Sequence, residues 1–332
     1  MRIARWERDG EVREGILLGD AAVPFPQGTT VQSLLEAGLE AALELGRRME
    51  LEAGGADGRE ATGDRLAEVR LLAPLRPVAI RDFVAFEEHV EGVSASVDGK
   101  GGVVPEWYEY PTFYFTNPHS VLGPGDAVTP PATQALDFEL EVAAVIGAVP
   151  GSDGANLDPA AGAAAIFGYT IMNDWSARDV QAREMKVRLG PAKGKDFGIA
   201  LGPWIVTADE LADRIDAEGF LELEAEVRVN GATIGRDLVS NMGWPFGELV
   251  AYASRNTRVV PGDVLGSGTV GNGGCLGELW GRNGERTPPP LEAGDVVAMS
   301  VERLGELEGV VGPQVEVPAI PPARPRPRRR TH

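Results

Sequence analysis

The 332-residue chain contains a single cysteine, Cys275, and only three histidines, His89, His119 and His332. One thiol excludes an internal disulfide framework and a cysteine-rich zinc site, and so few histidines exclude a histidine metal cage. Any metal must therefore be held by oxygen ligands. No apolar run approaches the ~18 residues that a membrane helix needs, and residues 1–10 lack the apolar core of a secretory signal. We therefore expect a cytoplasmic protein that does not bind membranes.

Basic residues are also scarce, with 31 Lys and Arg against 50 Asp and Glu and a formal net charge of −19. Five of the arginines lie in the last fourteen residues, so the rest of the chain is more acidic still. Because such a surface repels phosphate backbones, nucleic acid is excluded as the main partner. Hydrophobic residues make up 43% of the chain, which is enough for a globular protein with a sizeable core.

Turn-forming residues are abundant, with 43 Gly and 25 Pro, and this predicts many short strands and few helices. We expect a small N-terminal domain over residues 1–75 and a mainly β (α+β) domain over 76–318. Residues 319–332 are expected to form a disordered tail rich in Pro and Arg, since they cannot bury apolar surface. Residues 52–64, rich in Gly, Ala and Glu, are expected to form a mobile linker.

Local signals predict several elements of the second domain. Alternating apolar and polar residues over 221–229 indicate a half-buried strand, and Asn230-Gly231 indicates a two-residue hairpin turn after it. Asp158 before Pro159 is typical of a helix start. An apolar stripe at helical spacing predicts a helix over 246–253. Strands therefore outnumber helices.

Residues 81–92, RDFVAFEEHVEG, place acids and a histidine among apolar residues. Phe83, Phe86 and Val90 fall at helical spacing, which predicts a short helix. Asp82 and His89 are two helical turns apart and would then share one face. Taken alone, the segment fits a surface acid and a surface histidine better than a functional pair.

Residues 136–147, LDFELEVAAVIG, would place Asp137, Glu139 and Glu141 on one side of a strand. After Glu141 both faces become apolar, which predicts a strand that is covered on both sides. The strand over 221–229 also carries three alternating glutamates, but its polar face continues and is expected to meet water. Glu139 and Glu141 are therefore expected at the rim of a buried region.

Two carboxylates about 6 Å apart repel by roughly 3 kcal/mol at an effective dielectric constant of about 20. Partial burial adds several kcal/mol of desolvation cost for each ion. A divalent cation would offset both costs, and oxygen ligands suit Mg²⁺, Mn²⁺ or Ca²⁺. The strand alone indicates a metal site without establishing one.

Two further segments end or interrupt apolar sequence with polar groups. In residues 169–181, YTIMNDWSARDVQ, Asp174 follows a strand pattern, where a rigid scaffold presents functional groups. An acid that caps a solvated helix is an equally good interpretation. In residues 189–198, LGPAKGKDFG, glycines flank Lys193 and Lys195. These lysines could approach an oxyanion, although such loops are common.

The order and wording of five segments resemble the fumarylacetoacetate hydrolase family. DFVAFEEH, LDFELEVAAVIG, MNDWSARDVQ, GPAKGKDFG and GSGTVGNGGCLGELW follow one another over roughly residues 75–315. The resemblance implies a mixed β-sandwich roll catalytic domain with a small N-terminal α+β domain, and a homodimer. The chain departs from the family at Val84, where a tyrosine contacts substrate, and the stretch before Glu278 is compressed. These departures leave the substrate open.

Position by position, the resemblance implies a role for eleven residues. The implied ligands of a divalent metal are Asp82, Glu139, Glu141 and Asp174. His89 would activate water and Glu278 would orient it. The groups implied to stabilise an oxyanion are Arg178, Gln181 and Lys195. Tyr114 and Thr269 fall where the family contacts its substrate.

The implied activity is hydrolysis of a carbon–carbon bond in a small 2,4-dioxo acid of the fumarylacetoacetate or acylpyruvate type, with Mg²⁺, Mn²⁺ or Ca²⁺ as cofactor. The same scaffold could carry out decarboxylation, isomerisation or hydration of a 2-oxo acid. A His89–Glu278 pair favours hydrolysis, because simple decarboxylation needs no activated water. A non-catalytic module that binds Ca²⁺ structurally is the alternative from another class.

Three features outside this set also have an interpretation. Residues 92–102, rich in Gly and Ser, form either a lid over the substrate or an ordinary flexible loop. Cys275 has no matched histidine partner, so it is interpreted as a small buried filler. His119 lies outside every matched segment and is interpreted as structural.

Overall fold

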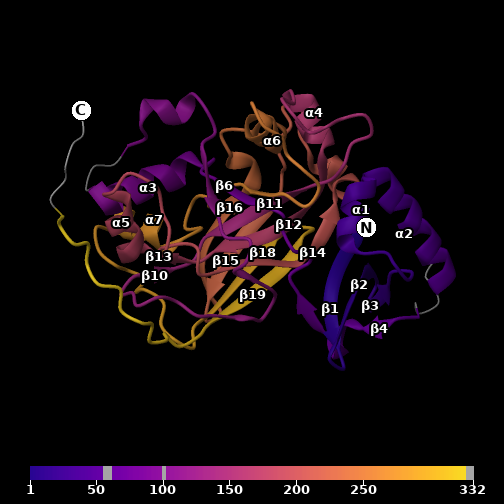
Figure 1. The fold of residues 1–332 in the computed structure, drawn as a ribbon, viewed down its shortest axis with the longest axis horizontal. Helices are drawn as coiled ribbons and strands as arrows, with labels where there is room; N and C mark the ends of the chain where they lie inside the picture. Colours follow the sequence, from indigo (N-terminus) through magenta and orange to yellow (C-terminus); the bar gives the residue numbers. More distant parts are fainter. Residues whose placement is uncertain (55–61, 99–101, 327–332) are drawn as a thin grey trace.

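The computed structural model describes residues 1–54, 62–98 and 102–326, and gives no side-chain environment for 95–98. One sheet of 12 strands runs through the molecule (Figure 1). Its strands are β1 (Arg2–Arg8), β2 (Glu11–Leu18), β3 (Ala21–Pro24), β4 (Asp64–Arg65), β5 (Arg70–Leu72), β6 (Ile80–Phe83), β7 (Phe113–Thr116), β8 (Val121–Leu122), β11 (Leu140–Ile146), β12 (Ile166–Asp174), β14 (Ile199–Thr207) and β17 (Val264–Gly266). The main path runs β4-β3-β2-β1-β14-β12-β11-β17-β6-β7, so segments distant in sequence become neighbours.

Two smaller sheets, seven α-helices and four short 3₁₀-helices make up the other regular elements of the described part of the chain. The five-stranded sheet has the order β16-β15-β18-β19-β9. Its strands are β9 (Ala127–Val128), β15 (Glu224–Val229), β16 (Ala232–Leu238), β18 (Val296–Val301) and β19 (Gly305–Val311), and a two-stranded sheet joins β10 (Leu136–Asp137) to β13 (Ser176–Ala177). The helices are α1 (Val31–Ala37), α2 (Leu39–Ala53), α3 (Glu87–Asp98), α4 (Pro159–Ala164), α5 (Arg178–Met185), α6 (Phe246–Ser254) and α7 (Leu276–Asn283). The expected mainly β, mixed α+β fold is confirmed.

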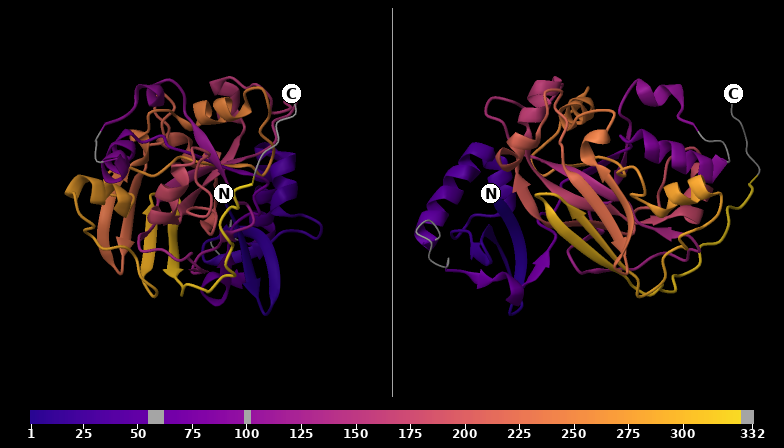
Figure 2. Two further views of the ribbon diagram at one scale, coloured as in Figure 1. Left: turned by 60° about the vertical axis from the view of Figure 1, so that its left-hand side comes forward. Right: turned by 180° about the vertical axis from the view of Figure 1, so that it is seen from behind.

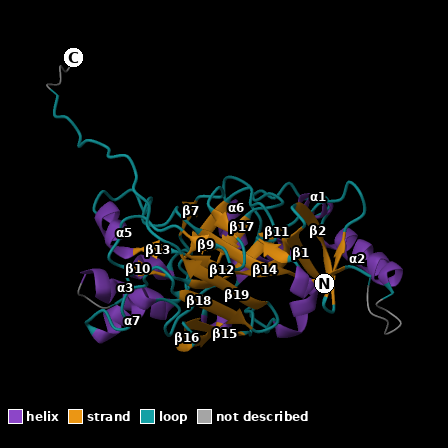
Figure 3. Ribbon diagram, turned by 90° about the horizontal axis from the view of Figure 1, so that it is seen from below, coloured by secondary structure: helices purple, strands orange, loops and turns teal. Residues whose placement is uncertain are grey.

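Five of the seven α-helices lie at the two ends of the molecule, whereas α4 and α6 pack together between these ends (Figure 1). Figure 3 shows α3, α5 and α7 beside β10 and β13 at one end, and α1 and α2 with the N-terminal strands at the other. The N-terminal strands lie beside the rest in both views of Figure 2, and β1 pairs antiparallel with β14 of the large sheet. Residues 1–75 therefore extend the same sheet, and a domain boundary at residue 75 remains a prediction.

The central strand β11 is apolar on both faces and covered on both faces, as its sequence predicts. All seven of its residues are buried. Val142 and Ile146 pack into the core shared with the five-stranded sheet, whereas Ala143 and Val145 pack into the core shared with α1 and α2. Because alternate side chains enter different cores, no face of β11 is left for water.

Several local predictions are confirmed. Asn230 and Gly231 adopt φ values of 50° and 81° in the β15–β16 turn, which is what a two-residue hairpin of this kind requires. The Asp158 side chain accepts a hydrogen bond from the backbone of Ala161 at the start of α4. The helix predicted over 246–253 is α6.

The predicted helix over 81–92 is wrong at its beginning. Residues Ile80–Phe83 form β6, which pairs parallel with β17 and antiparallel with β7. The helix α3 begins only at Glu87. Local apolar spacing cannot anticipate two strand partners that come from distant parts of the chain.

The predicted linker and tail are described only in part. Residues 52 and 53 end α2, and residues 55–61 lie outside the described part. Residues 319–326 are exposed and belong to no helix or strand, while 327–332 lie outside it. Among the described residues, no helix is both long enough and apolar enough to cross a bilayer.

Candidate active site

Four strands of the large sheet bring the predicted metal-binding carboxylates together. Asp82 comes from β6, Glu141 from β11 and Asp174 from the end of β12, and Glu139 immediately precedes β11. Each of the four is at most 4% exposed. In the order β12-β11-β17-β6, β11 and β6 flank β17, and β12 lies on the other side of β11. Sheet pairing therefore creates the cluster.

The four carboxylates share a small volume. One oxygen each of Asp82, Glu139 and Asp174 lies within 4.8 Å of the other two. Glu141 lies beside the same group, as the surroundings of Gly266 in β17 show. A Cβ atom built at Gly266 would lie 2.6 Å from Asp82 Oδ1 and 2.8 Å from Glu141 Oε2. Glycine at this position leaves room for both carboxylates, because any side chain would displace them.

Two cations, buried Lys195 and partly buried Arg178, neutralise one side of the cluster. Lys195 Nζ lies 2.6 Å from Asp174 Oδ2 and also pairs with Glu139. Arg178 Nη2 lies 2.7 Å from Glu139 Oε1. Burial opposes ionisation of Glu139, but the charges of Lys195 and Arg178 outweigh it and hold its pKa well below the usual range. Glu139 is thus a carboxylate whose negative charge is already compensated.

The other side of the cluster has no such compensation. The buried oxygens Asp82 Oδ1, Glu141 Oε1 and Asp174 Oδ1 have no hydrogen-bond partner among the described residues. Burial raises the pKa of Asp82 to about 6. Burial and the charge of Asp82 also raise the pKa of Glu141 well above its usual value. Unpartnered hard oxygens at this density are the donor set that a divalent cation prefers. The residues present therefore fit a divalent metal.

His89 lies on α3, not on one helix face with Asp82 as the sequence suggested, yet it reaches the cluster. Its Nε2 atom is 3.9 Å from Glu139 Oε1. Burial lowers its pKa to about 4, so the ring is neutral at pH 7. Its Nδ1 atom is 3.6 Å from Cys275 Sγ. Cys275 is buried, as predicted, but the expectation that it lacks a histidine partner is wrong.

Glu278 is fully buried on α7, but its contacts differ from those expected. Its Oε1 accepts a hydrogen bond from the Gly273 backbone at 3.1 Å and pairs with Arg282 at 2.8 Å. Burial raises its pKa to about 7. Among the described contacts, none is a hydrogen bond between Glu278 and His89. The pairing that the resemblance implies is not formed in this arrangement.

The three remaining predicted residues differ in how directly they contact this centre. The Tyr114 hydroxyl donates to Asp174 Oδ2, and burial raises the pKa of this hydroxyl well above its usual value. Gln181 accepts a hydrogen bond from Arg178 at 3.2 Å. Thr269 is buried in the loop after β17, 2% exposed. Of these three, Tyr114 directly touches a predicted metal ligand.

Asp137 has an anchoring position that sequence analysis missed. The strand predicted over 136–147 breaks after it, so Asp137 ends β10 while Glu141 lies in β11. Its carboxylate accepts from the backbone of Leu276 at 2.7 Å and Gly277 at 2.8 Å, and pairs with Arg178. Asp137 thereby ties the start of α7 to the start of α5. Its place in the DFELE segment was the available signal.

The candidate lid is mostly helical. Residues 92–98 continue α3 beyond His89, and 99–101 lie outside the described residues. The interpretation of this stretch as an ordinary flexible loop is therefore wrong for 92–98. Closure over a substrate remains a prediction.

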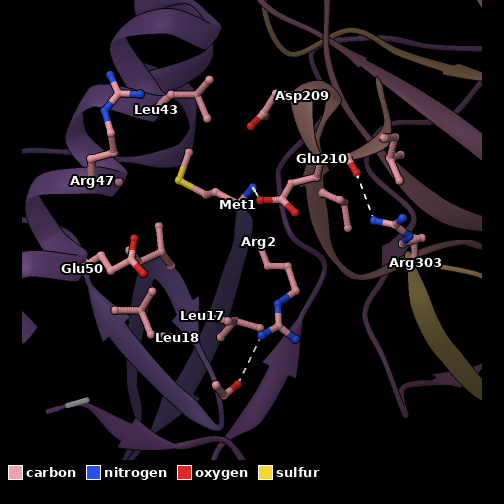
Figure 4. A pocket seen from close by; sticks show the side chains of 15 residues that line it. Met1, Arg2, Leu17, Leu18, Leu43, Arg47, Glu50, Asp209, Glu210 and Arg303 are labelled. Carbon is pink, nitrogen blue, oxygen red and sulfur yellow. Dashed lines mark hydrogen bonds and ion pairs between the residues drawn. The ribbon is translucent and has the colours of Figure 1, made fainter. Parts of the chain in front are cut away.

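A separate cleft of about 440 Å³ opens between the N-terminal segment and β14 (Figure 4). Met1, Arg2 and Glu210 line it, and its lining includes none of the eleven predicted site residues. Figure 4 shows the amino group of Met1 bonded to Glu210, at 2.8 Å. This cleft is therefore distinct from the carboxylate centre.

Comparison with known proteins gives relatives with several reactions. A fumarylacetoacetase from Arabidopsis thaliana is 31% identical over 289 residues, covering 71% of this chain and 68% of its own. An oxaloacetate tautomerase, YisK, from Bacillus subtilis (strain 168) is 28% identical over 253 residues, covering 74% of each chain. A crystal structure of 5-carboxymethyl-2-hydroxymuconate delta-isomerase from Mycobacterium smegmatis is 26% identical with a TM-score of 0.64, covering 95% of this chain and 100% of its own.

The family follows from the extent of these matches. The model for the fumarylacetoacetate (FAA) hydrolase C-terminal family matches residues 79–312, which include all eleven predicted site residues. The relatives above are a hydrolase, a tautomerase and an isomerase by name, so the family alone does not select one reaction. With most of its length matched and its buried carboxylates in place, the chain belongs to the fumarylacetoacetate hydrolase family.

Proposed function

We propose that this protein is a divalent-metal-dependent hydrolase that cleaves a carbon–carbon bond in a 2,4-dioxo acid of the fumarylacetoacetate or acylpyruvate type. The observation that carries the proposal is the buried cluster of four carboxylates, three of which have an oxygen without a hydrogen-bond partner among the described residues. His89 Nε2 lies beside it, 3.9 Å from Glu139. A metal site and an adjacent neutral base are the parts that hydrolysis needs.

Asp82, Glu139, Glu141 and Asp174 would hold the metal. When bound, a divalent cation would supply Lewis acidity toward the oxygens of the substrate. We infer Mg²⁺, Mn²⁺ or Ca²⁺ as the bound ion, because the ligands are all hard oxygens, which suit each of the three. No cysteine is among the ligands, which disfavours a zinc site.

The protein's own groups would then move the proton and stabilise charge. His89 takes a proton from water at Nε2, and the water oxygen bonds to the distal carbonyl carbon of the substrate. Lys195 and Arg178, already held in place by their carboxylates, stabilise the oxyanion. Collapse of the oxyanion breaks the carbon–carbon bond, and the leaving carbon regains a proton from His89. The products are a carboxylate and a 2-oxo acid.

A second candidate is isomerisation or tautomerisation of a 2-oxo acid on the same scaffold. The contacts of Glu278 with Gly273 and Arg282, instead of with His89, favour this candidate. Proton transfer within one substrate needs a base but no oriented water. The tautomerase and isomerase names among the relatives also support it. Decarboxylation remains a third outcome of the same assay.

A substrate panel tests the proposal. Acylpyruvates, oxaloacetate and hydroxydienoates are incubated with the protein and either Mg²⁺ or Mn²⁺, and the products are identified. Pyruvate with a carboxylate supports the hydrolase, whereas an isomer or CO₂ release assigns the other reactions. His89→Ala should abolish turnover and keep metal affinity, and the exposed His119→Ala serves as the matched control. Equal loss of turnover and metal affinity in His89→Ala would contradict the role given to His89.

We further propose a homodimer that acts on a small molecule in the cytoplasm. The family resemblance supports the dimer, and the formal net charge of −19 argues against nucleic acid as partner. Light scattering coupled to size-exclusion chromatography gives the mass directly. A mass near 35 kDa at micromolar concentration would contradict the dimer.

A further inference from the structure

The start of α7 contacts α3 at two places, and these are three residues apart along each segment. His89 of α3 contacts Cys275, the residue that caps α7. Three residues later on both segments, Gly92 packs against Glu278 so closely that a Cβ atom would lie 2.5 Å from Glu278 Cγ. Because a glycine allows this approach, α3 is held tightly against α7. The His89 ring is therefore fixed from its Nδ1 side.

The sulfur of Cys275 already acts as a hydrogen-bond acceptor. Its Sγ accepts from the Glu278 backbone N–H at 3.3 Å and so caps the helix. Cys275 is fully buried, and burial raises the pKa of its thiol well above the usual value. A neutral thiol is a weak donor with remaining acceptor capacity, whereas a ring N–H is the stronger donor. The sulfur is therefore suited to accept from the histidine.

We propose that Cys275 is a positioning residue: its sulfur accepts a hydrogen bond from Nδ1–H of His89 and leaves Nε2 as the free proton acceptor. The two nitrogens of a neutral imidazole exchange roles, and the hydrogen bond made by one decides the state of the other. Nε2 is the nitrogen that faces Glu139 and the carboxylate centre. The catalytic part of this inference rests on the proposed function, but the tautomer does not.

Cys275 is therefore the partner of His89, the role that the resemblance implies for Glu278. The opposite arrangement, in which the thiol donates to Nδ1, would put the ring proton on Nε2 and block it as a base. Positioning groups of this kind typically change activity by about 10- to 100-fold. Cys275→Ala should therefore lower kcat by that factor and change KM by less than about twofold. Cys275→Ser keeps an acceptor and should restore most of kcat.

The tautomer can be read directly because the chain has only three histidines. Long-range ¹H–¹⁵N correlation spectra of the ¹⁵N-histidine-labelled protein at neutral pH distinguish a protonated from an unprotonated ring nitrogen. His89→Gln assigns its signals. The proposal expects Nδ1 protonated and Nε2 unprotonated in the wild-type chain and in Cys275→Ser. In Cys275→Ala the Nδ1–H population should fall, while the signals of His119 and His332 stay unchanged.

A wild-type spectrum with the proton on Nε2 would overturn the proposal, and so would a Cys275→Ala spectrum identical to wild type. Thr30→Ala is the matched control for loss of a helix cap, since Thr30 caps α1 by accepting from Ser33 at 3.1 Å. It should leave the His89 spectrum and kcat unchanged. Absence of turnover on every 2-oxo acid would contradict the proposed function while leaving the tautomer result intact, so the two failures are distinguishable.

Discussion

Strands β11 and β15 have similar sequences and opposite surroundings. Both alternate glutamate with apolar residues: Glu139 immediately precedes β11 and Glu141 lies in it, while Glu224 and Glu226 lie in β15. Glu141 is fully buried, with an unpartnered oxygen. Glu226 pairs with Arg228 at 3.1 Å and with Arg236 at a sheet face that meets water. The same local pattern thus produces a candidate metal ligand in one sheet and a solvated ion pair in the other.

The difference arises from the two sheets and not from the glutamates. β11 lies between β12 and β17 in the middle of the large sheet, and two cores cover it. β15 lies in the five-stranded sheet and buries only one face, which gives its alternating exposure. A carboxylate in the first setting pays the full desolvation cost, so it must find a counter-charge or remain protonated. Burial therefore decides which carboxylates can hold a metal.

The largest predicted effect comes from neutralising one glutamate in each strand. Glu141→Gln should lower kcat/KM on the substrate identified by the panel by on the order of 10⁴-fold, because a bound ion supplies several kcal/mol of charge stabilisation. Glu226→Gln should change it by less than twofold. Steady-state kinetics at saturating Mn²⁺ measures both. Equal activity of the two variants would remove the distinction between the strands.

Removing one cation from each sheet should separate buried from exposed pairing. Lys195→Met leaves Asp174 and Glu139 with less compensation and should lower the free energy of unfolding by about 3–5 kcal/mol in EDTA. Arg236→Met, which removes an exposed partner of Glu226, should cost less than about 1 kcal/mol. Urea denaturation measures both. A Lys195→Met variant as stable as Arg236→Met would contradict a role for burial.

Glu278 shows how burial acts on a carboxylate that already has an arginine partner. Like Glu226 it pairs with an arginine, but unlike Glu226 it is fully buried. Its folded pKa is about 7 against 4.5 for the ordinary carboxyl, so protonation favours the folded state. The stabilisation is therefore complete below the unfolded pKa and is lost as pH rises through 7, by up to roughly 3 kcal/mol. Glu278→Gln should flatten the curve of unfolding free energy between pH 4.5 and 7, measured by urea denaturation. A Glu278→Gln curve that runs parallel to wild type would contradict the assignment, and Glu226→Gln controls for the loss of an arginine-paired carboxylate.

The smallest predicted effects come from replacing two glycines, one of which lies against neighbouring side chains and the other of which has a positive φ. Gly266→Ala would push a Cβ atom against the oxygens of Asp82 and Glu141, and it should lower Mn²⁺ affinity about tenfold. Gly231→Ala meets no atom within 4 Å but keeps a φ of 81°. It should cost about 1 kcal/mol of stability and leave Mn²⁺ affinity unchanged. Calorimetric titration with Mn²⁺ compares them, and the reverse pattern would contradict the geometry around Gly266.

The sequence predicts the parts of the fold that depend on local pattern. The apolar run after Glu141 predicts the doubly covered strand β11, and Asn230-Gly231 predicts the β15–β16 hairpin, because both depend on adjacent residues alone. β6 is different: Ile80–Phe83 becomes a strand through pairing with β7 and β17, and a helical spacing of apolar residues hides it. Long-range pairing overrides local spacing there.

The same limit applies to the site. Family resemblance names the carboxylates of the centre and the histidine and cations that contact them, although their separate roles remain proposals. It does not predict the contact between His89 and Cys275, which are 186 residues apart in sequence. It also misses Asp137, whose backbone partners Leu276 and Gly277 come from α7. Contacts between helices that meet only in the folded chain leave no periodic signal.

Calorimetric titration with Mn²⁺ tests most directly whether the buried carboxylates form one metal site. The wild-type chain and the Glu224→Gln/Glu226→Gln variant should each bind one ion per chain with similar affinity. The Asp82→Asn/Glu141→Gln variant should bind none over the same concentration range while remaining folded by circular dichroism. Binding of equal strength in all three chains, or none in the wild type, would contradict the account.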